Sequence, residues 1–123
     1  LAEKTAGTDR DNCYMVTIGD DIREKALQTV RRLSLLGGVR AVYLFGSCAE
    51  GHANAWSDID LASFMTGIEN WNIEQRAKAM SLVMQKVGAN VEAHLFFASV
   101  LEKSEKDSFA QDILKRGICV YKG

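Results

Sequence analysis

The sequence predicts an α+β domain in which helices pack against a small mixed β-sheet. Apolar residues recur at helical spacing in three segments, and apolar runs of strand length separate those segments. Glycines mark most of the boundaries. At 123 residues, with 47% hydrophobic and 25% charged residues, the chain has the size and composition of one globular domain. The expected order is helix, strand, strand, helix, strand, helix, strand.

The first residues differ from the rest of the chain. Residues 1–14 are polar, contain several Thr and Asp residues, and show no periodicity. We expect them to be a flexible leader or an expression remnant, with Met15 as a natural start. Residues 15–123 then form the single domain.

A helix and a strand are expected next. The helix begins at Asp20, which can cap it, and ends at the pair Gly37-Gly38. Its buried face is expected to carry Ile22, Ala26, Val30 and Leu33. Residues 39–45 are mostly apolar and predict a buried strand that Gly46 ends.

The central part of the chain predicts a strand, a helix and another strand. Residues 48–57 are expected to form a turn and loop before a strand at about residues 58–64. Asn72 and Gln75 resemble a capping box that starts the next helix, which Gly88 ends. The apolar side chains expected on its buried face are Ile73, Ala77, Met80, Met84 and Val87. Residues 91–97 predict the third strand.

The C-terminal part predicts a short turn over residues 99–103. Ser104 and Asp107 are expected to start a last helix, which ends at Gly117. Residues 118–121 then form a final short strand.

Composition excludes several classes of protein. The net charge of −1 lacks the basic excess that is typical of nucleic-acid binding. No apolar run approaches the ~20 residues of a membrane span, and no secretory pattern opens the chain. The three cysteines show no metal-ligand spacing, which predicts reduced thiols and a cytoplasmic protein.

Two carboxylates one residue apart are the first candidate site. In a strand, residues i and i+2 point to the same face, so Asp58 and Asp60 converge while Ile59 and Leu61 face the core. Convergent carboxylates suit Mg²⁺, which takes oxygen ligands and keeps part of its shell for water and phosphate. The preceding Gly46-Ser47 turn suits a phosphate, because glycine allows close approach and exposed amides bind anions.

A third acid is expected from the next strand. Val91 and Ala93 point to one face of the expected strand, and Glu92 points to the other. A charged side chain buried there would need a partner. We therefore expect Glu92 to be the third ligand of a two-metal site. His94 shares that face, and we expect it to be structural or peripheral.

Taken together, these residues resemble the DNA polymerase beta-like nucleotidyltransferase superfamily, and within it the minimal nucleotidyltransferase group, over residues 20–122. The matching residues are Phe45-Gly46-Ser47, Ala49, Gly51, Ser57-Asp58-Ile59-Asp60-Leu61, Glu92, and the closing run from Phe109 to Tyr121. The resemblance implies a palm-like nucleotidyltransferase fold for residues 15–123.

The resemblance also implies an activity, which is metal-dependent transfer of a nucleoside monophosphate from ATP or another nucleoside triphosphate. Gly46 and Ser47 would hold the triphosphate. Asp58, Asp60 and Glu92 would be catalytic and would bind Mg²⁺, with two ions expected. Many minimal nucleotidyltransferases are encoded beside a HEPN protein, and some are antitoxins that adenylylate that toxin, so a HEPN-type protein partner is implied. Separately, an exposed flank of the sheet would need a cover, so a homo-oligomer or a partner complex is expected.

One departure from the family pattern leaves other functions open. The family commonly has Ala-Arg-Gly after the turn, whereas this chain has Ala49-Glu50-Gly51. A carboxylate in place of a cation near a triphosphate would weaken nucleotide binding. The alternatives are a catalytically weak module that neutralises a partner by binding, and a nucleotidyltransferase acting on a small molecule such as an aminoglycoside.

Overall fold

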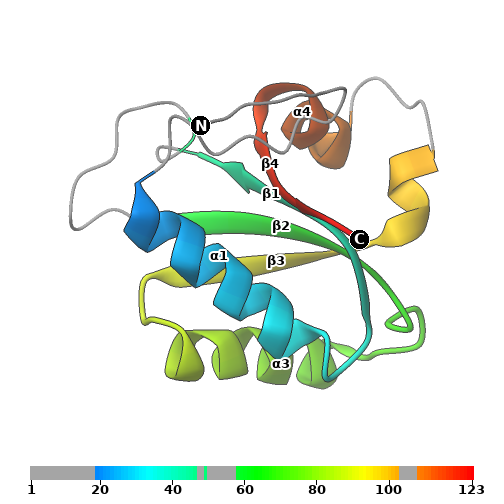
Figure 1. Ribbon diagram of the computed structural model, residues 1–123. Coiled ribbons are helices and arrows are strands. Elements are labelled where there is room, and N and C mark those ends of the chain that lie inside the picture. The colour runs from blue at the N-terminus through cyan, green and yellow to red at the C-terminus, as the bar shows by residue number, and fades with distance from the viewer. Residues whose placement is uncertain (1–18, 47–48, 50–57, 103–107) are drawn as a thin grey trace.

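In the computed structural model, helices cover both faces of a four-stranded sheet (Figure 1). The structure describes residues 19–46, 49, 58–102 and 108–123. Its elements are α1 (Asp20–Leu33), β1 (Gly38–Phe45), β2 (Ile59–Thr66), α3 (Ile73–Lys86), β3 (Val91–Phe97), the 3₁₀ helix η2 (Ala98–Glu102), α4 (Phe109–Arg116) and β4 (Ile118–Lys122). The predicted α+β class and element order are confirmed. The predictions for residues 1–14 and for most of the 48–57 loop fall outside the described residues, as do Ser104 and Asp107 themselves.

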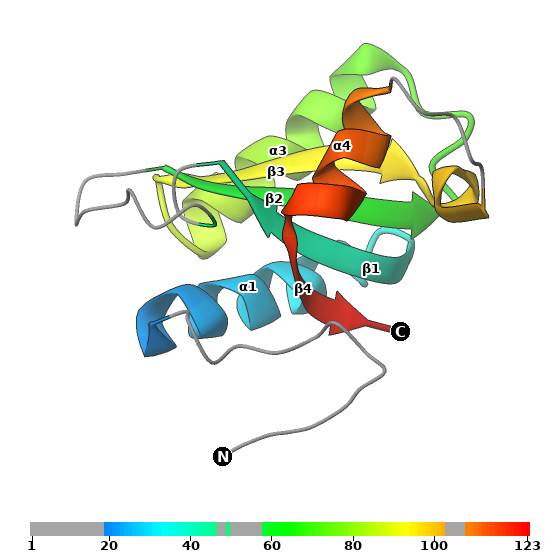
Figure 2. The same ribbon diagram turned by 90° about the horizontal axis from the view of Figure 1, so that it is seen from above.

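The strand order is β3-β2-β1-β4, so the sheet is mixed. β1 pairs antiparallel with β2 and β4, whereas β2 and β3 run parallel. A parallel pair needs a crossover connection, and α3 supplies it. Since parallel strands begin at the same edge of the sheet, the first residues of β2 and β3 lie side by side (Figure 2).

The core is divided by the sheet into two layers. α1 and α3 pack on one face around residues such as Leu33, Leu44 and Leu61. α4 and η2 cover the other face around Tyr43 and Phe64 (Figures 1 and 2). Successive residues of β2 therefore alternate between the two layers, and Asp60 faces the α4 side.

Two helix starts differ from the predictions. Gly19, rather than Asp20, is the N-cap of α1, and it has no side chain to cap the helix. The last helix begins at Phe109 because Ser108 Oγ accepts a hydrogen bond from the Gln111 amide at 3.0 Å. The predicted buried face of α1 is confirmed at Ala26, Val30 and Leu33 and is partly exposed at Ile22.

Helix α3 confirms one prediction and corrects another. The capping box of Asn72 and Gln75 is present. The predicted buried face is wrong at Ile73 and Met84, which are 85% and 41% exposed, whereas the predicted Val87 packs against the core. The buried residues of the helix are Ala79 and Val83. Apolar side chains occur all around this helix, so their spacing did not select a face. The packing of α3 against the sheet determines which face is buried.

Two observations concern the predicted location of the protein. Cys119 is disulfide-bonded, so the expectation of reduced thiols is wrong for this cysteine. In the described part of the chain, every helix is too short or too polar to cross a bilayer. The cytoplasmic location stays a prediction.

Candidate functional site

Three carboxylates meet where β2 and β3 begin. Asp58 directly precedes β2, Asp60 is the second residue of β2, and Glu92 is the second residue of β3. Asp60 and Glu92 are register partners in the parallel pair. A side-chain hydrogen bond joins Glu92 to Asp58. The structure thus brings together the three acids that the sequence singled out, and we call them the acidic cluster.

The acidic cluster is electrostatically strained without a cation. Desolvation by burial, the charges of Asp60 and Asp58, and the hydrogen bond with Asp58 raise the pKa of Glu92, while His94 opposes the shift. Crowded carboxylates resist full ionisation unless a proton or a positive charge lies among them. Their oxygens are the ligands that a hard divalent cation such as Mg²⁺ prefers, so the residues fit a metal of that class.

His94 lies in the cluster as well. Its Nε2 is 3.2 Å from Asp60 Oδ1 and 3.7 Å from Glu92 Oε1. The edge of the Phe45 ring packs on the imidazole, with the ring centroids 5.1 Å apart. The sequence predicted a structural or peripheral histidine at position 94, although the two-residue spacing between Glu92 and His94 puts both on one strand face. That spacing was the signal that could have assigned it to the site.

The Gly46 turn lies directly against Asp60. Gly46 has a φ of 77°, and a Cβ there would lie 2.7 Å from Asp60 Oδ2. Both the left-handed conformation and the close approach therefore require glycine. Ser47 and Glu50 fall outside the described residues, so the proposed triphosphate contact of Ser47 and the effect of Glu50 stay predictions.

A cavity of about 180 Å³ lies between Gly46 and α4. Its lining residues are Phe45, Gly46, Ala49, Phe109, Asp112, Ile113 and Arg116. Arg116 Nε lies 3.0 Å from Asp112 Oδ1 in an ion pair, so the cavity has a paired cation on its wall. Because Gly46 touches Asp60 and also lines the cavity, a molecule bound there would lie beside the acids.

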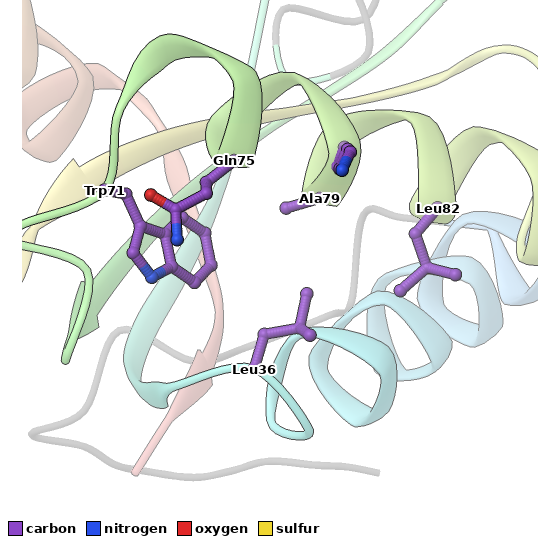
Figure 3. Close-up of a pocket in the computed structure, with 6 residues that line it drawn as sticks. Leu36, Trp71, Gln75, Ala79 and Leu82 are labelled. Carbon is purple, nitrogen blue, oxygen red and sulfur yellow. The ribbon is translucent and has the colours of Figure 1, made fainter.

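A second hollow lies on the opposite layer. This groove of about 340 Å³ is lined by Leu36, Trp71, Gln75, Lys78, Ala79 and Leu82. Figure 3 shows Leu36 across the groove from the side chains of α3, with Trp71 at one end. α3 covers the sheet face away from the acidic cluster, so the sheet separates this groove from the candidate chemistry.

Comparisons with known proteins agree with this geometry. Residues 28–123 match the family described as Polymerase beta, Nucleotidyltransferase. A search of curated proteins gives no match. A crystal structure of a "putative nucleotidyltransferase" from Sulfolobus solfataricus has a TM-score of 0.58 at 21% identity, covering 85% of this chain and 89% of that one. A toxin–antitoxin crystal structure with AMP-PNP also has a TM-score of 0.58, at 18% identity, covering 82% of this chain and 73% of that one.

At these low identities, the two solved structures show that the fold is shared. The family match spans most of the chain and includes the whole acidic cluster. The chain therefore belongs to the polymerase beta nucleotidyltransferase family.

Proposed function

We propose that this chain is a metal-dependent nucleotidyltransferase that moves AMP from ATP onto a partner protein, with a HEPN-type toxin as the expected acceptor. The acidic cluster beside the Gly46 turn is the observation that carries the proposal. Family membership supports nucleotidyl transfer. The similarity to a toxin–antitoxin structure with AMP-PNP supports an adenine nucleotide and a protein partner.

Each site residue has a role in this proposal. Asp58 and Asp60 hold Mg²⁺, with two ions expected, and Glu92 completes the ligand set. When bound, the cations neutralise phosphate charge and orient the triphosphate. Gly46 and Ser47 contact the triphosphate, and the cavity between Gly46 and α4 receives the adjoining part of the substrate.

The proposed reaction is one substitution at phosphorus. The acceptor hydroxyl oxygen attacks the α-phosphorus of ATP, forming a new P–O bond. The bond from that phosphorus to the oxygen that bridges the α- and β-phosphorus atoms breaks, and pyrophosphate leaves with that oxygen and its electron pair. The proton of the acceptor hydroxyl passes to Glu92, which faces the other two acids.

Intact-protein mass spectrometry tests the proposal. The purified chain, ATP, Mg²⁺ and the protein encoded by the neighbouring gene should give an acceptor whose mass has increased by one AMP. The double substitution Asp58→Asn and Asp60→Asn should abolish the increase. Glu74→Gln is the matched control, since Glu74 is an exposed acid on α3 that pairs with Lys78. An unmodified acceptor with every nucleoside triphosphate would refute the assignment.

A second candidate is a module that neutralises its partner by binding alone. Ala49-Glu50-Gly51 favours it, because Glu50 puts a negative charge where the family commonly has a positive one. This reading predicts that neutralisation of the partner persists in the Asp58→Ala and Asp60→Ala double variant. Loss of neutralisation in a folded double variant would eliminate the module and support transfer.

A further inference from the structure

We propose that His94 is a direct ligand of the divalent cation, so that this site binds a first-row transition-metal ion such as Mn²⁺ more tightly than Mg²⁺. The inference deepens the proposed function, because it names the class of cation for the same site. It is carried by the arrangement of Asp60 and Glu92 near the start of β2 and β3 with His94, two residues further along β3.

The separations between the three side chains fit a shared ion. One ligand atom from each lies within 4.8 Å of the other two. His94 Nε2 is 3.2 Å from Asp60 Oδ1 and 3.7 Å from Glu92 Oε1. Neighbouring ligands about 2.1 Å from one ion are ~3.0 Å apart in an octahedron and ~3.4 Å apart in a tetrahedron. The observed distances fall close to these edges, so Nε2 occupies a ligand position.

The imidazole is also held in that orientation. His94 projects from the interior of β3, and its side chain is 32% exposed. The Phe45 ring packs on it edge to face, and Phe109 packs on Phe45 with centroids 5.7 Å apart. A rigid strand and an aromatic pair therefore position Nε2 toward the carboxylates, as a preorganised ligand requires.

The ligand chemistry decides the preferred metal. Mg²⁺ takes oxygen ligands and gives up water reluctantly. An imidazole nitrogen raises the affinity of a site for first-row transition metals relative to Mg²⁺, and Mn²⁺ is the member of that series that also suits the two carboxylates. Replacing the imidazole ring by an amide should therefore weaken the binding of Mn²⁺ more than the binding of Mg²⁺.

The competing role for His94 is that of a positioning residue. In that case Nε2–H donates a hydrogen bond to Asp60 Oδ1, and the ring has no lone pair directed at the ion. Loss of the ring would then lower the affinities for Mn²⁺ and Mg²⁺ by the same factor, because the binding of both ions would depend equally on the position of Asp60.

Isothermal titration with MnCl₂ and MgCl₂, without nucleotide or acceptor, separates these roles. The wild-type protein should bind Mn²⁺ at least roughly ten-fold tighter than Mg²⁺, and His94→Gln should lose roughly ten-fold in Mn²⁺ affinity. Its Mg²⁺ affinity should change by less than about two-fold. The sequence has two histidines, so His52→Gln is the matched control and should leave both affinities unchanged.

Pulsed electron paramagnetic resonance of the bound Mn²⁺ gives a readout that needs no substitution in the first instance. The wild-type complex should show ¹⁴N coupling from an imidazole, and His52→Gln should retain it. A complex without this coupling, or an equal loss of Mn²⁺ and Mg²⁺ affinity in His94→Gln, would overturn the proposal. Circular dichroism confirms that each variant is folded.

The outcome is independent of the transfer reaction. A nitrogen-coupled Mn²⁺ site with no modified acceptor would support the histidine ligand and count against the proposed function. A modified acceptor together with an all-oxygen metal site would support the proposed function and count against the histidine ligand.

Discussion

At the scale of single residues, Gly46 and Gly67 form a natural pair for comparison. Both have positive φ angles, 77° and 84°. A Cβ on Gly46 would lie 2.7 Å from Asp60 Oδ2, whereas the nearest atom to a Cβ on Gly67 is the Cα of Gly37 at 3.8 Å. Both glycines adopt the left-handed backbone conformation, but of the two, Gly46 is the one that lies against the acidic cluster.

Alanine at these two positions should therefore have different effects on metal binding. Both Gly46→Ala and Gly67→Ala should lower the free energy of unfolding by about 1–2 kcal/mol, from the left-handed conformation alone. Gly46→Ala should also displace the Asp60 carboxylate and weaken Mn²⁺ binding. Denaturant titration and calorimetry measure the two effects. Equal Mn²⁺ affinities in the two variants would show that the Gly46 contact is irrelevant to the site.

The sequence predicted the positions of the acids better than the role of the histidine. Strand alternation places Asp58 and Asp60 on one face and Glu92 opposite Val91 and Ala93. The same alternation applies to His94, yet a half-buried strand face equally accommodates a histidine directed at solvent. The 3.2 Å approach to Asp60 depends on the register between β2 and β3, which local spacing does not encode.

At the scale of elements, α3 shows which signals are local. Its start was predictable because a capping box uses side chains and amides three residues apart. Its buried face was not, since apolar residues surround the helix and tertiary packing chooses among them. Ala79 and Val83 were buried in place of the predicted Ile73 and Met84.

The capping box should stabilise the protein without affecting the site. Asn72 Oδ1 accepts a hydrogen bond from the Gln75 amide at 2.8 Å, and Gln75 Oε1 accepts one from the Asn72 amide at 2.9 Å. Asn72→Ala should lower the free energy of unfolding by about 1 kcal/mol, and Asn72→Ser should retain most of it. Denaturant titration measures both changes. Altered Mn²⁺ affinity in Asn72→Ala would contradict the separation of this end of α3 from the acidic cluster.

At the scale of the whole molecule, the two core layers share the strand that carries the site. Leu61 packs toward α1 and α3, while Phe64 packs toward α4 and η2, and both are fully buried. The adjacent Asp60 is therefore held by packing on both faces of β2. A destabilising substitution in either core layer should therefore destabilise the whole sheet.

Core substitutions should consequently reveal one cooperative unit. Leu61→Ala should cost about 2–5 kcal/mol and Phe64→Ala about 3–5 kcal/mol of the free energy of unfolding. Each should shift one common transition seen by circular dichroism and by tryptophan fluorescence. Met84→Ala, at a 41% exposed position, should stay within about 0.5 kcal/mol. Separate transitions for the two probes would mean that the layers unfold independently.

The order of the strands in the sheet could not be predicted from the sequence, for a related reason. The expected mixed sheet is present, but the order β3-β2-β1-β4 depends on contacts between segments far apart in the chain. Apolar runs specify that strands are buried. They do not specify which strand lies beside which.

The parallel pairing of β2 and β3 has a kinetic consequence. Asp60 and Glu92 become neighbours only after the chain has traversed α3 and returned to the same sheet edge. Closing so long a loop is slow, because its entropy must be lost before the new contacts form. A cation held between the two strands would therefore bind only after β2 and β3 have paired, and its uptake during refolding would report the closure of this loop. Once bound, it would hold β2 and β3 together at the ends where both strands begin.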